Sequence, residues 1–295
     1  MKKLLFPFVI LLLFLFCILQ PQKAVSGAAA GLSLWYCTVL PTLLPCMVLS
    51  GYLISSSLIC HLPPAPLAFV AGWFCGYPMG AKTIADLWKN GRISEKKGKR
   101  LLRLCCMPSP MFLTGFLCMG MLRLSLLDSL PLLAALYVPP VLCFFLNRPD
   151  ARHTSSSLPK ASTTPSETGF LQTFLNFEKA MMEGFLIMVK IGGYLMFFTM
   201  LSYFFRSLIQ NPFLSSLIPG FLEMTSGAAF TVQSGLSAPM TAALCFSFAS
   251  FGGLSGLAQT VSVLKSTPFS GKSYFLWKLF QAVLTFTAIL LLYPR

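Results

Sequence analysis

Two short glycine-rich stretches contain the residues best suited to bind a small molecule. The first runs from Gly76 to Gly80 and is followed by Lys82, and the second runs from Gly252 to Gly256. Glycine lets the backbone approach a ligand closely, although small residues also allow helices to pack closely in membranes. The residues that we expect to contact a substrate are Gly76, Tyr77, Pro78, Gly80, Lys82, Gly252, Gly253, Ser255 and Gln259.

Lys82 and Gln259 are long polar side chains just after the two glycine-rich breaks. A helix that restarts after the first break directs free backbone N–H groups and a positive dipole end toward it. Together with Lys82 this favours an anion such as a carboxylate. The alternative is that Lys82 snorkels to the cytoplasmic edge of the membrane. Gln259 can donate and accept hydrogen bonds, which suits an amide, a carboxylate or a ring nitrogen.

Glu223 is the acid that most strongly suggests a coupling site, because it lies inside the apolar stretch 213–232. A charge at the centre of a membrane helix costs at least about 2.5 kcal/mol. A buried carboxyl could couple transport to a proton or another cation, with Thr225 as a polar neighbour. The alternative is a structural role, in which Glu223 bonds to Thr225, Ser226 or a neighbouring helix.

Lys190 raises the same expectation, because it lies in the middle of the apolar run 185–205. Glu183 lies earlier on roughly the same helix face and is a candidate partner through a bridging group. We therefore group Lys190 with Glu223 and Thr225 as intramembrane polar residues.

No metal, cofactor or catalytic activity is expected. The ten cysteines include no CxxC pair, and His61 and His153 are the two histidines and lie in different loops. No nucleophile with a neighbouring base is visible, so an intramembrane enzyme is the weakest hypothesis.

The elements that position these residues must be membrane helices. Of 295 residues, 56% are hydrophobic and only 10% are charged, whereas a soluble domain carries about 25% charged residues. The apolar runs are long rather than alternating, which excludes a transmembrane barrel. We predict an all-α, polytopic membrane protein with two pseudo-symmetric halves, each containing a re-entrant or broken helical hairpin.

The pseudo-symmetry rests on an alignment of the two glycine-rich stretches. When Gly76 is placed on Gly253, Thr83 falls on Thr260 and each stretch is preceded by an apolar segment. Paired, glycine-interrupted segments in the two halves of a membrane protein point to a transporter site. The alternative is chance similarity between glycine-rich membrane helices.

The chain divides into four segments. Residues 4–19 are apolar and are expected to be an uncleaved first span, although residues 24–26 resemble a signal-peptide cleavage site. Further spans are expected near 37–59, 104–122, 131–146, 185–205 and 274–293. The segments are an N-terminal span (1–26), a first repeat (27–147) with a re-entrant hairpin (67–87), a polar cytoplasmic linker (148–176) and a second repeat (177–295) with a broken hairpin (237–265).

Basic residues set the expected orientation. The net charge is +14, and the segment 89–103 has seven bases against one acid. Between apolar runs such charge indicates contact with anionic lipid and a cytoplasmic loop rather than nucleic-acid binding. Lys2 and Lys3 place the N-terminus in the cytoplasm. The protein is thus expected in the cytoplasmic membrane, and its oligomeric state is left open.

The topology of the second half has two solutions. If 213–232 crosses the membrane fully, the second hairpin opens to the cytoplasm, which suits Lys265, Lys272 and Lys278. If that stretch is bent or re-entrant, the two halves are inverted and those lysines lie outside. We favour the inverted arrangement.

Several motifs resemble one known family. Gly76–Lys82 reads GYPMGAK and is followed by SPMF at Ser109–Phe112; LEMTSG at Leu222–Gly227 and FGGLSGLAQ at Phe251–Gln259 follow in the second half. Together they resemble sporulation integral membrane proteins of the YlbJ type, which belong with the nucleoside-recognition (Gate) domain proteins. The resemblance implies a transporter-like fold with two re-entrant hairpins and an association with moving dipicolinate into the spore. Residues 60–71 depart from the pattern, because the connection there is shorter.

Two functions are compatible with these features. The first is a carrier that moves a small organic anion, with dipicolinate as the candidate given by the resemblance, by alternating access. The second is a membrane scaffold or assembly factor that acts through the basic loop 89–103.

Overall fold

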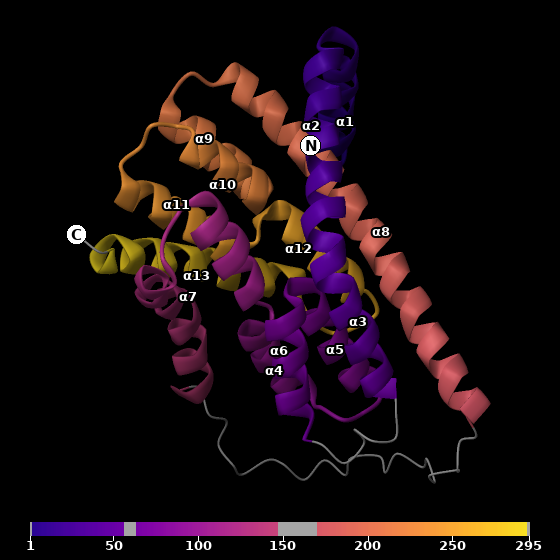
Figure 1. Cartoon of the computed structure of the whole chain (residues 1–295). Helices are drawn as coiled ribbons and strands as arrows, with labels where there is room; N and C mark the ends of the chain where they lie inside the picture. Colours follow the sequence, from indigo (N-terminus) through magenta and orange to yellow (C-terminus); the bar gives the residue numbers. More distant parts are fainter. Residues whose placement is uncertain (1, 56–62, 147–169, 294–295) are drawn as a thin grey trace.

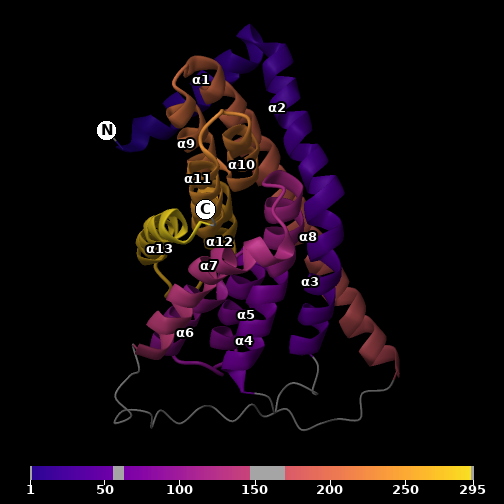
Figure 2. The ribbon, with the colours of Figure 1, turned by 60° about the vertical axis from the view of Figure 1, so that its left-hand side comes forward.

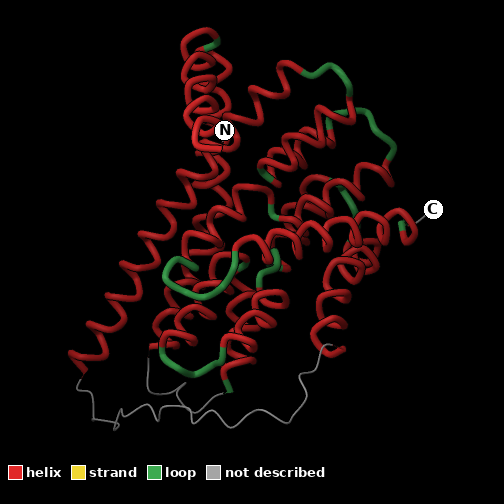
Figure 3. Tube along the Cα trace, turned by 180° about the vertical axis from the view of Figure 1, so that it is seen from behind, coloured by secondary structure: helices red, strands yellow, loops and turns green. Residues whose placement is uncertain are grey.

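The described part of the chain consists of helices joined by short loops (Figures 1 and 3). The structure is a computed structural model that describes residues 2–55, 63–146 and 170–293, and no strand forms within them. The elements are α1 (Lys2–Leu19), α2 (Pro21–Leu34), η1 (Trp35–Val39), α3 (Leu40–Ser55), α4 (Pro64–Cys75), α5 (Tyr77–Lys89), α6 (Glu95–Cys105), η3 (Phe112–Met121), α7 (Leu126–Leu146), α8 (Phe170–Leu208), α9 (Pro212–Leu222), α10 (Met224–Val232), α11 (Ala238–Phe251), α12 (Gly253–Val263) and α13 (Gly271–Leu292).

Four described helical segments are long and apolar enough to cross a bilayer, which needs about 20 residues. The pair Ile10–Leu19 and Pro21–Val39, bent by 112°, makes a fifth if it is counted as one span. The chain is therefore a multi-pass integral membrane protein, as its composition predicted. The four segments are Leu126–Leu146, Gln172–Leu208, Ala238–Val263 and Gly271–Leu292.

The N-terminal boundaries differ from the predicted ones. The helical run of α2, η1 and α3 is unbroken from Pro21 to Ser55, so neither a division at residue 26 nor a span that begins at residue 37 is present. Proline suits the first turn of a helix, where its missing N–H has no intrahelical partner. This run packs along α8 (Figure 2). A Cβ at Gly27 would lie 2.8 Å from the Cα of Met200, so small residues set this close approach.

The chain folds back on itself at Gly76, where the sequence predicted a turn. Gly76 has φ +82°, which a residue with a Cβ rarely adopts. The arms α4 and α5 then pack together, and a Cβ at Gly80 would lie 3.0 Å from the Cα of Gly72. In one continuous helix these two glycines would be about 12 Å apart at 1.5 Å per residue. The two helices therefore form a hairpin.

A second hairpin is formed by α9 and α10, with its turn at Glu223. A Cβ at Gly227 would overlap the Cα of Gly220, which again requires the two arms to fold back in contact. Of the two arrangements considered for 213–232, the structure has the bent one. The arms of this hairpin lie at the opposite end of the molecule from α4 and α5 (Figures 1 and 2).

The predicted second hairpin at 237–265 is wrong in one respect. A break is present at Gly252, which has φ +84°. However, the helices on its two sides continue in one direction and together make a single span-length segment, Ala238–Val263. The break interrupts this segment without reversing it, and the hairpin of this half is the preceding α9–α10 pair.

The predicted span 104–122 is also interrupted. Helix α6 ends at Cys105, and a second helical segment, η3, begins only at Phe112. Pro108 lies in the non-helical residues 106–109, and Pro110 begins the helical turn that leads into η3; proline lacks the N–H that would continue a helix. The structure therefore adds a break to those predicted from the glycines.

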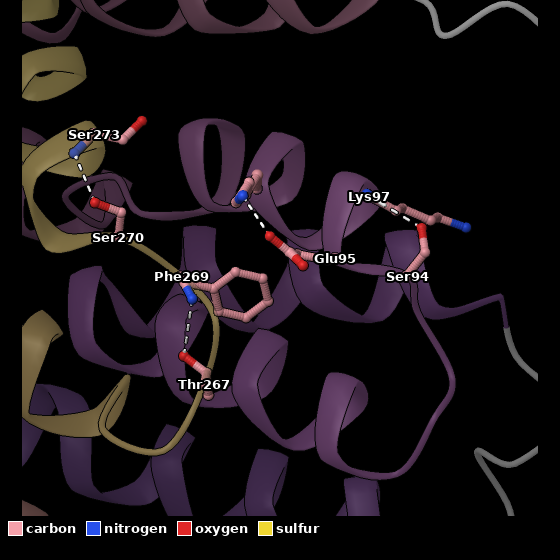
Figure 4. A network of polar contacts seen from close by, with 8 residues as sticks. Ser94, Glu95, Lys97, Thr267, Phe269, Ser270 and Ser273 are labelled. Carbon is pink, nitrogen blue, oxygen red and sulfur yellow. Dashed lines mark hydrogen bonds and ion pairs between the residues drawn. The ribbon is translucent and has the colours of Figure 1, made fainter.

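Helix α6 contains most of the basic segment 89–103. Its N-terminus is capped by Ser94, whose hydroxyl accepts a hydrogen bond from the Lys97 N–H at 3.4 Å. The loop before α13 lies beside it, with Phe269 packed against the Cα of Gly98 (Figure 4). The predicted linker 148–176 lies outside the described residues up to 169, and its last residues already belong to α8.

Candidate functional site

Four helix interruptions surround one cavity of about 80 Å³, several times the space that one water molecule needs. They are the two hairpin turns and the breaks between α6 and η3 and between α11 and α12, and residues of η1, α3 and α8 contribute the rest of the cavity wall. The lining residues are Thr38, Val39, Leu43, Gly76, Tyr77, Pro78, Pro108, Ser109, Phe112, Ile191, Leu195, Glu223, Met224, Thr225, Gly252, Ser255, Gly256 and Gln259.

The break at Gly252 is in contact with both hairpin turns. A Cβ at Gly252 would lie 3.2 Å from Cζ of Tyr77, at the turn of the α4–α5 hairpin. A Cβ at Gly253 would lie 2.9 Å from the carbonyl oxygen of Leu222 and 3.0 Å from the Cα of Glu223, at the other turn. Both glycines have positive φ. Only glycine gives this backbone the conformation and the closeness that the two turns require.

Tyr77 links the first hairpin to the end of α11. Its ring is buried, and its hydroxyl donates a hydrogen bond to the carbonyl oxygen of Ala249, with Ser250 O at 3.4 Å. A helix end leaves its last carbonyls without backbone partners. Tyr77 therefore satisfies a carbonyl that the break at Gly252 has freed.

Side chains satisfy the carbonyls at the end of α6 in the same way. Trp73 Nε1 donates to Leu104 O at 3.2 Å, and Lys278 Nζ donates to Cys106 O at 3.0 Å. Trp277 Nε1 donates to Arg103 O at 3.2 Å and Tyr137 Oη to Pro108 O at 2.7 Å. Buried carbonyls are costly when unpaired. The interruption of this helix is thus stabilised by donors from three other elements.

Glu223 is both the turn of the second hairpin and a wall of the cavity. It is 1% exposed, and its carboxylate accepts from Ser226 N at 2.7 Å, from Thr225 N at 3.0 Å and from the Thr225 hydroxyl. It therefore caps α10, whose positive end favours a negative charge. The sequence left a structural role, with bonds to Thr225 or Ser226, as the alternative to a coupling role. These hydrogen bonds are present. Glu223 nevertheless also lines the cavity.

Ser255 and Gln259 form a polar pair on the first turns of α12. Gln259 Nε2 donates to Ser255 Oγ at 3.1 Å, and both residues line the cavity. This leaves the Gln259 side-chain carbonyl as a hydrogen-bond acceptor. The second predicted stretch thus contributes hydrogen-bonding side chains, whereas the first contributes backbone and the Tyr77 ring.

Four predicted site residues lie away from the cavity wall. Gly80 and Gly253 serve close packing, Gly80 against Gly72 and Gly253 against Leu222. Lys190 is exposed on α8. Lys82 is a member of a surface cluster described next.

Lys82 pairs with two acids rather than facing the cavity. Its Nζ lies 3.0 Å from Asp86 Oδ2 and 3.3 Å from Glu183 Oε2. The Asp86 pair is within α5, and the Glu183 pair joins α5 to α8. Glu183, the candidate partner of Lys190, therefore partners Lys82 instead.

Lys278 is a buried cation that was not among the predicted site residues. It is 1% exposed, and its Nζ lies 3.1 Å from Gln281 Oε1 and 4.8 Å from the centroid of the Tyr77 ring. Because Lys278 lies near the start of the predicted last span, the sequence indicated that it is, like Lys265 and Lys272, a residue near the membrane edge. Its position inside that apolar run was the available indication, since intramembrane charges are by default functional candidates.

Among the described residues, no group of three or more His, Cys, Asp or Glu side chains could hold a metal ion. The polar groups of the cavity are hydroxyl, amide and carboxylate, with backbone N–H groups at the helix starts. This arrangement can bind and orient a small polar molecule by hydrogen bonds.

The comparisons with known proteins agree with the membrane class. No protein-family model matches the chain, so the Gate-domain assignment stays a prediction, and no solved structure matches. The sporulation integral membrane protein YlbJ of Bacillus subtilis (strain 168) is 25% identical over 321 aligned positions, which cover 93% of this chain and 78% of that protein. The chain is therefore a multi-pass membrane protein distantly homologous to sporulation integral membrane protein YlbJ.

Proposed function

We propose that this protein is a carrier that moves a small organic anion across the cytoplasmic membrane by alternating access. The observation behind the proposal is that two helical hairpins, whose arms lie at opposite ends of the molecule (Figure 1), have their turns at one largely apolar cavity that contains a few hydrogen-bonding groups. Non-helical backbone within a membrane protein is tolerated where it is buried in protein or lines a cavity. In this proposal the protein is not an enzyme, and its N-terminus and basic segment 89–103 face the cytoplasm.

The order of elements supports two pseudo-symmetric halves. In the first half a hairpin (α4–α5) is followed by an interrupted helix (α6–η3) and a last helix (α7). In the second half a hairpin (α9–α10) is followed by an interrupted helix (α11–α12) and a last helix (α13). Carriers with inverted repeats place their substrate at interrupted helices of this kind. This order of elements supports the proposed repeat, in which the two hairpins correspond to each other and Gly76 does not correspond to Gly253.

The helix ends at the cavity favour an anion. Helices α5, α10 and α12 all start at its wall, so positive dipole ends and backbone N–H groups point to it. At the negative ends, the carbonyls of α6 and α11 are satisfied by donors such as Lys278 and Tyr77. Glu223 caps α10 and is the proposed site of a coupling proton or cation.

The substrate class that we propose is a small dicarboxylate. The homologue is named for sporulation, and the resemblance described above connects this family with dipicolinate, an aromatic dicarboxylate. Ser255 and Gln259 would hydrogen-bond its carboxylate or ring nitrogen.

Uptake into liposomes tests the proposal. The purified full chain would be reconstituted and supplied with radiolabelled dipicolinate, with simple dicarboxylates and with nucleosides. We expect uptake of dicarboxylate above protein-free liposomes, and its loss in the double variant Ser255→Ala and Gln259→Leu. Thr287→Val, an exposed change on α13, is the matched control. Wild-type protein that inserts correctly but moves none of these compounds would refute the carrier, and uptake of nucleosides alone would refute the anion.

A further inference from the structure

A fully buried lysine lies directly behind the cavity wall. Lys278 sits within the candidate span Gly271–Leu292 and is 1% exposed. The groups around its ammonium are neutral: the Cys106 carbonyl, the Gln281 side-chain oxygen and the Tyr77 ring. The three ion pairs among the described residues involve Lys82 and Lys99 as cations, and none involves Lys278.

Burying the Lys278 ammonium in this place is energetically unfavourable, so we expect the charge to contribute to function. Burying an ammonium without an acid partner costs several kcal/mol, and hydrophobic residues of similar volume are commonly tolerated in its place. A methionine would fill the same space and leave the Cys106 carbonyl, and also the Gln281 side-chain oxygen, without the Lys278 donor. The helix-capping role alone therefore does not explain a lysine here, since a neutral amide could also donate to that carbonyl.

The position of Lys278 connects it to the cavity through one residue. Its ammonium lies 4.8 Å from the centre of the Tyr77 ring, and Tyr77 lines the cavity. None of the described residues of the cavity wall is Lys, Arg or His. Lys82, which the sequence suggested as the anion-binding charge, is already paired with two acids.

Glu223 is the acid on the described cavity wall, so its charge also contributes to the electrostatic potential in the cavity. Its carboxylate accepts hydrogen bonds from Thr225 and Ser226 at the positive end of α10. Those donors offset its charge locally. The cation next to the wall is the ammonium of Lys278, which acts through the buried Tyr77 ring, where charges interact more strongly than in water.

We propose that Lys278 is the specificity-determining charge of this cavity, which makes it prefer a carboxylate over a neutral molecule of the same shape. This inference rests on the proposed anion carrier and names the residue that selects the anion. Lys278 acts across the Tyr77 ring without touching the ligand, so it sets preference through its field and through the position of Tyr77.

A comparison of the binding of a charged ligand and its neutral analogue distinguishes an electrostatic role of Lys278 from a structural one. Pyridine-2,6-dicarboxylate and pyridine-2,6-dicarboxamide would be titrated against the purified full chain, and the ratio of their dissociation constants measured. We expect the wild type to prefer the dicarboxylate by at least about tenfold, which corresponds to about 1.4 kcal/mol. Lys278→Gln and Lys278→Met should lower this preference about tenfold, to what the helix ends alone provide, and Lys278→Arg should keep it.

Thr285→Val is the matched control, because Thr285 is equally buried on α13 and bonds to Ser250 rather than to Tyr77. A purely structural role would weaken both ligands equally and leave the ratio unchanged in Lys278→Gln. That result, with a preference present in the wild type, would overturn this inference and leave the carrier intact. A wild type without any preference would overturn the anion proposal together with this one.

Discussion

The hydroxyl of Tyr77 donates a hydrogen bond to the carbonyl oxygen of Ala249, 172 residues later in the chain. This bond joins the turn of the α4–α5 hairpin to the last turn of α11, immediately before the break at Gly252. It shows how the molecule keeps interrupted helices inside an apolar environment: a side chain from another element takes up the freed carbonyl.

Removal of that hydroxyl should destabilise the protein without changing its shape. In Tyr77→Phe the carbonyls of Ala249 and Ser250 lose their side-chain donor while buried, which costs about 1–3 kcal/mol. A lower midpoint of thermal unfolding in detergent would measure this. Tyr36→Phe, on an exposed ring, should change the midpoint little. Equal midpoints for the two variants would contradict the assigned role.

The glycines that close the second hairpin should tolerate no side chain. A Cβ at Gly227 would overlap the backbone of Gly220, so Gly227→Ala must separate the arms of α9 and α10. We expect loss of monodisperse protein in size-exclusion chromatography. Gly193→Ala is the control, since nothing lies within 4 Å of its Cβ position and alanine favours a helix by about 1 kcal/mol. A well-folded Gly227→Ala protein would argue against the hairpin.

The pair Lys82–Glu183 should act between helices rather than on the ligand. Lys82→Met should leave ligand affinity nearly unchanged and cost about 1 kcal/mol or less, because both side chains are partly exposed. The exchange of charges, Lys82→Glu with Glu183→Lys, should recover part of the stability lost in either single change. Binding measured by titration and stability measured by unfolding check the two parts separately. Loss of binding in Lys82→Met would return this lysine to the site.

Substitution of Glu223 by Gln should remove the coupling of uptake to an ion gradient while the protein still folds. Glu223→Gln keeps one acceptor for the Thr225 and Ser226 N–H groups, so the hairpin should still form. Without the carboxylate, uptake should no longer respond to an imposed proton or sodium gradient. Thr225→Val removes a hydroxyl partner of the same carboxylate while keeping the charge, and should keep the response. An unaltered gradient response in Glu223→Gln would exclude it as the coupling group.

The basic face of α6 distinguishes the carrier from a scaffold. Lys96, Lys97 and Lys99 are exposed, so their replacement by Gln should weaken the binding of anionic lipid headgroups to the inserted protein, by about 1 kcal/mol per charge. Uptake per inserted molecule should persist in a carrier. If these changes abolish function while the hairpin variants do not, the scaffold hypothesis is the better one.

The sequence predicted some features of the site because they are local. A glycine between two apolar segments predicts a break, and the breaks occur at Gly76 and Gly252. Whether the chain then reverses cannot be decided locally. It reverses at Gly76, where Gly72 and Gly80 meet, and continues at Gly252, where both neighbouring turns pack against the backbone. Helix–helix approach of this kind depends on residues far apart in sequence.

Solvent preference and backbone freedom belong to each residue, so the sequence by itself determined that this chain is a helical membrane protein with interrupted segments. The partner of each charge depends on the three-dimensional neighbours, so only the tertiary structure decided which lysine lies by the cavity. Lys82 has acids on α5 and α8 within reach and pairs with them. Lys278 meets Cys106 and Tyr77, both in the other half of the chain, and is buried beside the site.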